Sequence, residues 1–166
     1  MTAVDPWDGV EVDLAVDLPT GTGYMYGVSS FVDGPCARDY DPWEHAEILD
    51  LPVVFRDDLP DSEMVACYAP EYEAIFVRPG LHGAVERCAI AHEIVHYEQA
   101  DSGKNDLQEE RADRIAARRL IRPRHLERLS DVTEDAAVVA LEVNVTEKIM
   151  RTFMRMIRQG RINPYG

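Results

Sequence analysis

The stretch GAVERCAIAHEIVHYEQ, residues 83–99, decides the fold that the sequence predicts. Its apolar residues recur at helical spacing, and Cys88 and Val95 fall on the same side as two histidines. Ile90 and Ile94 make much of the opposite side apolar as well. A helix that is apolar over most of its surface lies inside a domain, so we predict a central helix here.

The same stretch contains a metal-binding pattern. His92 and His96 are four residues apart, so both imidazoles project from one helix face about one turn apart. That separation lets them share one zinc ion. Glu93 follows the first histidine and is the candidate general base, which would take a proton from a water that the metal activates. The pattern therefore predicts a Zn²⁺ site with a catalytic Glu93, although such ligands can also hold manganese.

A catalytic zinc usually has a third protein ligand, and the next predicted helix, over residues 107–121, offers one. Glu109 shares a face of this helix with Asp113 and with small alanines, which would let the two helices approach closely. Glu109 is therefore the expected third ligand, and Asp113 could accept the other ring N–H of a zinc-bound histidine. Glu110 is the alternative ligand, because it lies only about 100° further around the helix.

A small sheet is predicted before the central helix, and more helices after it. Asp41 and Pro42 are typical of a helix start, and this first helix should end near residue 50. Three runs rich in β-branched and aromatic residues predict a small antiparallel sheet: residues 52–56, 64–68 and 74–77. The last run is a candidate sheet edge that would bind an extended peptide. Further helices are predicted over residues 133–141 and 146–159.

These elements predict an α+β fold in which the small sheet packs on the central helix. We expect an irregular N-terminal extension over residues 1–40 and a zincin-like metallopeptidase domain over residues 41–130. A C-terminal helical segment over residues 131–166 should pack on that domain. The apolar spacing in this segment resembles a helix-turn-helix.

Charge and composition narrow the classes of partner and compartment. The chain has a net charge of −14, and residues 1–80 hold 17 acidic residues against three basic ones. Such a surface repels phosphate backbones, so direct binding of nucleic acid is not expected. No apolar run is long enough to span a membrane, and residues 1–6 do not resemble a signal peptide, which predicts a cytoplasmic protein. The three cysteines are too few and too scattered for a disulfide framework.

The zinc helix and the following acidic helix together resemble the ImmA/IrrE family of metallopeptidases. The resemblance rests on residues 53–60, on AHEIVHYE at residues 91–98 and on EERADRIAARRLI at residues 109–121, and it spans roughly residues 42–160. It implies a cytoplasmic, gluzincin-like endopeptidase that cleaves a regulatory protein, often a transcriptional repressor. By this resemblance His92, His96 and Glu109 are the metal ligands and Glu93 is the catalytic base.

A second hypothesis comes from another functional class. The chain could be a non-proteolytic interaction module that keeps a structural metal site, such as the partner of a repressor in a toxin–antitoxin or lysogeny pair. A base beside the metal favours the enzyme, because a purely structural site has no need of Glu93. The residue that would stabilise the oxyanion stays open among four candidates: Tyr68, His82, Tyr97 and His125.

Overall fold

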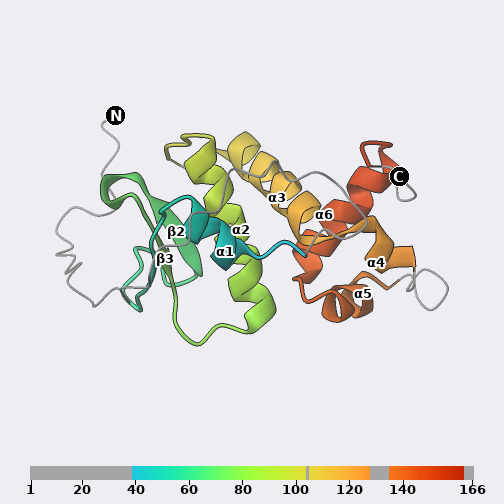
Figure 1. Cartoon of the computed structure of the whole chain (residues 1–166), viewed down its shortest axis with the longest axis horizontal. Coiled ribbons are helices and arrows are strands. Elements are labelled where there is room, and N and C mark those ends of the chain that lie inside the picture. Colours follow the sequence, from blue (N-terminus) through green and yellow to red (C-terminus); the bar gives the residue numbers. More distant parts are fainter. Residues whose placement is uncertain (1–38, 104, 128–134, 163–166) are drawn as a thin grey trace. The chain divides into compact units, whose positions relative to one another are not determined.

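A computed structural model describes residues 39–103, 105–127 and 135–162. Almost all of the predicted N-terminal extension, residues 1–38, lies outside the described residues. The chain from Asp39 onward forms one compact unit, in which a small sheet and a set of helices surround one helix (Figure 1). The predicted α+β class is confirmed.

The sheet has three strands, β1 (Val53–Phe55), β2 (Ala66–Ala69) and β3 (Ala74–Val77), in the order β1-β3-β2. β2 and β3 are antiparallel, and the short 3₁₀ turn η1 (Pro70–Tyr72) reverses the chain between them. β1 and β3 are parallel, with Val53 opposite Ile75. The sheet is therefore mixed, and the prediction of an antiparallel sheet was wrong.

The prediction of β3 as a peptide-binding edge was also wrong, because β3 is the central strand. All four of its residues are fully buried. The sequence pattern is consistent with a central strand. Ala74-Ile75-Phe76-Val77 is a continuous apolar run, which is typical of a strand buried on both faces, whereas a strand with one solvated face alternates apolar and polar residues. β1 and β2 have only β3 as a strand partner among the described residues.

The helices before and at the centre of the fold begin and end close to the predicted residues. α1 (Pro42–Ile48) starts as expected, with the Asp41 carboxylate accepting the backbone N–H of Trp43 at 2.9 Å. α2 (Gly83–Glu98) is the predicted central helix, and the His82 side chain caps its N-terminus by accepting the backbone N–H of Ala84.

After α2 the chain is helical. α3 (Asp106–Leu120) is capped by Asn105, and α4 (Pro123–Glu127) is a short helix that was not predicted, because Pro123 had been interpreted only as a stop. Proline also fits the first position of a new helix, which is its place in α4. α5 (Ala136–Glu142) and α6 (Glu147–Arg158) follow, and Thr146 caps α6. Part of the expected helix over residues 133–141 lies outside the described residues.

Two hydrophobic cores lie on opposite sides of α2. Ile90 and Ile94 pack with the sheet and α1, while Cys88 and Ala91 pack with α3, α5 and α6. This arrangement explains why α2 is apolar over most of its surface, since α2 lies between the sheet on one side and α3 and α6 on the other (Figure 1). In the described part of the chain, no helix has both the length and the apolar character needed to cross a membrane.

Candidate metal centre

The two histidines of α2 point toward one another. Their Nε2 atoms are 3.0 Å apart, and their side chains are largely buried, with 13% of His92 and 11% of His96 exposed. The i, i+4 spacing on a straight helix produces this geometry, and the two cores hold the helix in place.

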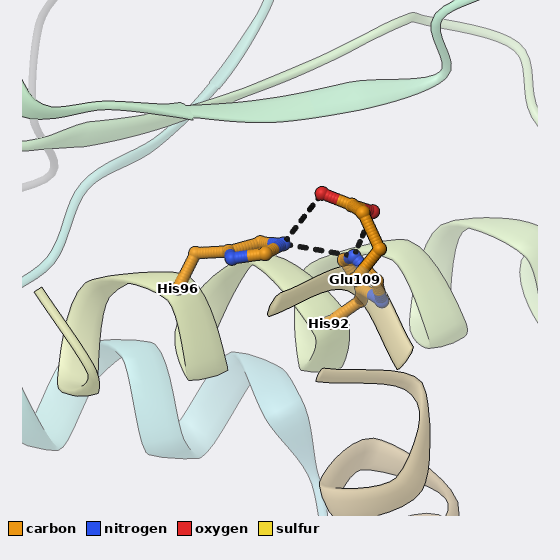
Figure 2. A group of neighbouring side chains, drawn as sticks. All are labelled: His92, His96 and Glu109. Atoms are coloured by element: carbon orange, nitrogen blue, oxygen red, sulfur yellow. Dashed lines mark hydrogen bonds and ion pairs between the residues drawn. The ribbon is translucent and has the colours of Figure 1, made fainter. Parts of the chain in front are cut away.

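Glu109 completes the cluster from α3. One carboxylate oxygen lies 3.1 Å from Nε2 of His92 and the other 3.3 Å from Nε2 of His96 (Figure 2). Fully buried Ala112 and Ala116 on the same side of α3 allow the close approach of the two helices. Glu110, the alternative ligand, is exposed and pairs with Arg114 at 3.2 Å instead.

Each imidazole is held from behind by an aspartate. Nδ1 of His92 lies 3.0 Å from the Asp113 carboxylate, and Nδ1 of His96 lies 3.0 Å from the Asp101 carboxylate. Asp113 thus lies at the ring nitrogen of His92 that is turned away from His96 and Glu109. A carboxylate at Nδ1 keeps the proton of a neutral imidazole on that nitrogen, so the lone pair is on Nε2.

Asp101, in the segment between α2 and α3, was not among the residues predicted for the site. Its side chain is only 5% exposed, and its backbone N–H donates to the His96 carbonyl at 3.0 Å as the chain leaves α2. Ala100, just before it, has a left-handed backbone with φ of 50° that turns the chain back toward the helix. An aspartate five residues after the second histidine was the available signal.

A cation stands behind each aspartate. Lys148 of α6 lies 2.7 Å from the Asp113 carboxylate, and Arg111 of α3 pairs with Asp101. Burial alone would raise the pKa of Asp113, but His92 and Lys148 outweigh it and lower the pKa below its ordinary value. The same balance holds for Asp101, where Arg111 and His96 lower the pKa against the effect of burial. Both aspartates are therefore held as carboxylates.

The cluster fits a metal ion. The ligand atoms of His92, His96 and Glu109 all lie within 4.8 Å of one another. With both ring protons on Nδ1, three electron-pair donors face one another at about 3 Å. Such groups repel unless a cation or a proton lies between them, and two imidazoles with a carboxylate are a ligand set that suits zinc. Burial lowers the pKa of His92, yet Asp113 and the nearby glutamates outweigh this and raise the pKa above its ordinary value.

Glu93 lies between the two histidines in sequence and beside the cluster in space. Burial raises the pKa of its carboxyl above the ordinary value, although His92 and His96 act in the opposite direction. The backbone N–H of Tyr68 donates to the Glu93 carboxylate at 2.8 Å. In the register of β2 with β3, the Arg78 N–H bonds to the Val65 carbonyl, so the Tyr68 N–H points away from β3. The outer edge of β2 thus orients Glu93.

The four residues considered for oxyanion stabilisation differ in where they lie relative to the cluster of His92, His96 and Glu109. His82 caps the far end of α2 and is not part of the cluster. The rings of Tyr68 and Tyr97 pack edge to face at 5.5 Å, close to the helix face of Glu93. The side chain of His125 lies outside the described residues.

A cavity of about 270 Å³ opens between α3 and α6 and shares Glu109 and Asp113 with the cluster. Its lining carries both acidic and basic side chains, among them Asp106, Glu110, Arg114 and Arg155. Small-molecule sites are commonly ~300–1,000 Å³ and mostly apolar, so this cavity does not suggest a site for an organic cofactor.

Comparison of the chain with protein-family models, with curated proteins and with solved structures finds no match.

Proposed function

We propose that the chain is a zinc-dependent endopeptidase. One observation carries the proposal: three ligand atoms of His92, His96 and Glu109 converge, and the carboxylate of Glu93 is oriented beside them. A purely structural zinc site is usually closed by four protein ligands, whereas three protein ligands are typical of a catalytic one. Among the described residues, the candidate metal group has three members.

The roles of the side chains follow from their positions. When bound, zinc supplies Lewis-acid chemistry, since it polarises the peptide carbonyl and makes water acidic enough to attack at neutral pH. Glu93 takes the proton of the attacking water as the new C–O bond forms, and it passes that proton to the amine nitrogen as the C–N bond breaks. The Tyr68 N–H fixes the direction in which the Glu93 carboxylate points. Asp101 and Asp113 keep both imidazoles in the tautomer that binds metal.

The resemblance to the ImmA/IrrE family suggests the substrate class, a regulatory protein such as a transcriptional repressor. The acidic first half of the chain would attract a basic protein of this kind. The second candidate function is the non-proteolytic interaction module, for which the same cluster would serve only to hold the fold together.

Metal content tests the site. We expect about one zinc per chain in the purified wild type, and loss of zinc in Glu109→Ala. Glu110→Ala is the matched control, because it removes a neighbouring carboxylate that pairs with Arg114 and does not face the cluster. Elemental analysis after dialysis against metal-free buffer measures this. If zinc is retained in Glu109→Ala but lost in Glu110→Ala, the third ligand is Glu110 and not Glu109. If the wild type takes up no metal, the proposal that the chain is a zinc enzyme is wrong.

Activity is tested separately with Glu93→Gln. This variant should bind zinc as the wild type does but produce no new protein N-termini when added to a cell lysate, as measured by mass spectrometry of terminal peptides. Glu86→Gln makes the same charge change two turns earlier on α2 and should keep the activity. If expression of Glu93→Gln in cells has the same effect as expression of the wild type, the function of the chain does not require proteolysis, and the non-proteolytic interaction module explains it better.

A further inference from the structure

Lys148 connects the C-terminal helix α6 to the metal centre. Its Nζ lies 2.7 Å from one oxygen of Asp113 and 3.0 Å from the other. Asp113 also lies 3.0 Å from Nδ1 of His92. The two contacts of Asp113 therefore connect Lys148 of α6, through α3, to His92 of α2. The aspartate is largely buried, with 13% of its side chain exposed, whereas 69% of the lysine side chain is exposed.

The position of Lys148 is set by the packing of α6. Ile149, Met150 and Phe153 are buried in the core that α6 shares with α2 and α3. The chain before α6 is tied to α2 as well, since Arg87 donates to the Asn144 carbonyl at 3.1 Å and the Thr146 N–H lies 3.4 Å from Sγ of Cys88. Lys148, on the first turn of α6, is therefore carried to Asp113 by tertiary structure and not by a flexible tail.

We propose that Lys148 is a positioning residue for the metal centre, so that α6 is energetically part of the site. The inference rests on the proposed metal site. Lys148 holds the Asp113 carboxylate, which in turn holds the His92 ring with its Nε2 directed at His96 and Glu109. The C-terminal segment, which the sequence predicts only to pack on the metallopeptidase domain, then contributes to metal affinity through this lysine.

Lys148 could act on the metal centre through its charge or by orienting Asp113, and the two explanations predict opposite changes in zinc affinity when the lysine is removed. A lysine that acted only through its charge would repel a divalent cation, so its removal would leave zinc affinity unchanged or increase it. A lysine that orients Asp113 would lower zinc affinity on removal, because the His92 ring loses its fixed direction. A loss of affinity is therefore the signature of positioning.

The test compares Lys148→Gln with Lys148→Arg and with Arg151→Gln in the full-length protein, by competition for zinc with a chelator. Arg151 lies one turn further along α6 and pairs with Glu147 at 2.6 Å, so Arg151→Gln removes the same charge without touching Asp113. We expect Lys148→Gln to weaken zinc binding about three- to tenfold, below the ~10–100-fold typical of a direct partner of a ligand. Lys148→Arg should restore most of the affinity, and Arg151→Gln should change little.

A cobalt-loaded sample provides a second readout. The visible absorption of Co²⁺ reports ligand geometry, so it should shift in Lys148→Gln and stay unchanged in Arg151→Gln. Unchanged or tighter zinc binding in Lys148→Gln, or equal effects of the two glutamine variants, would overturn the positioning role and leave the peptidase proposal standing. A wild type without metal would overturn both.

Coupling between α6 and the metal must also be reciprocal. Zinc should slow amide hydrogen exchange over residues 149–156 of the wild type, and the protection should be smaller in Lys148→Gln. The same measurement on metal-free proteins shows whether Lys148→Gln has damaged the fold. Equal zinc-induced protection in the wild type and the variant would contradict the coupling.

Discussion

The candidate metal centre has two arms, each of which runs from a histidine through an aspartate to a basic side chain, but the arms differ in how far apart their residues lie in the sequence. In one arm His96 is held by Asp101 and Asp101 by Arg111; in the other, His92 is held by Asp113 and Asp113 by Lys148. The His96 arm is local, because its aspartate follows the histidine by five residues and its arginine follows the aspartate by ten. The His92 arm joins three helices, and its lysine lies 35 residues beyond the aspartate.

The two arms also differ in burial. The side chain of Asp101 is 5% exposed and that of Arg111 is 37% exposed, against 13% for Asp113 and 69% for Lys148. An ion pair with less contact with water is screened less and loses more when one partner is removed. We therefore infer that the His96 arm stabilises the metal-free fold, whereas the His92 arm mainly couples the C-terminal helix to the metal.

The largest expected effect does not distinguish the arms. His92→Ala and His96→Ala should each lower zinc affinity by more than about 100-fold, because each removes a ligand and not merely a partner of one. Chelator competition measures this, and His82→Ala is the matched control, since that histidine only caps α2. Retention of tight zinc binding in one of the two variants would show that the histidines are not equivalent ligands.

The aspartates should separate the arms. Asp101→Ala and Asp113→Ala are each expected to weaken zinc binding about 10–100-fold. Asp101→Ala should also destabilise the metal-free protein by about 1–3 kcal/mol, because Arg111 and His96 lose a buried charged partner. Asp113→Ala should cost less, since the exposed Lys148 can turn to water. Urea unfolding of metal-free samples tests this, and a larger loss in Asp113→Ala would reverse the comparison.

The smallest expected effect is a pH dependence of stability that comes from His45, which belongs to neither arm. Burial between α1 and α2 lowers the pKa of His45 below its ordinary 6.5, although Glu98 acts in the opposite direction. The unfolded chain therefore binds this proton at a higher pH than the folded chain does. The stability that His45 contributes is present above pH 6.5 and is lost as the pH falls through the lowered pKa. The stability difference between wild type and His45→Gln, measured from pH 5 to 8, should show this slope, and a flat difference would contradict it.

Much of the centre was predictable because it depends on short-range geometry. Helical periodicity places His92 and His96 on one face, and the same rule places Asp113 on the face of Glu109. The choice between Glu109 and Glu110 was not decided by periodicity, because the two residues differ by only about 100° around α3. The packing of α3 on α2 through Ala112 and Ala116 turns Glu109 toward the histidines and Glu110 toward Arg114.

What the sequence determined by itself was the local structure: the central helix, its pair of inward histidines, the acidic helix after it and the caps that begin α1 and α6. Each of these depends on interactions within a few residues along the chain. Only the tertiary structure decided that β3 is the central strand, that Tyr68 of β2 orients Glu93 and that Lys148 reaches Asp113. The contacts of Tyr68 and Lys148 join residues that are 25 or more positions apart in the sequence. The place of β3 depends on its insertion between β1 and β2. Local conformational preferences determine neither the long-range contacts nor the strand order.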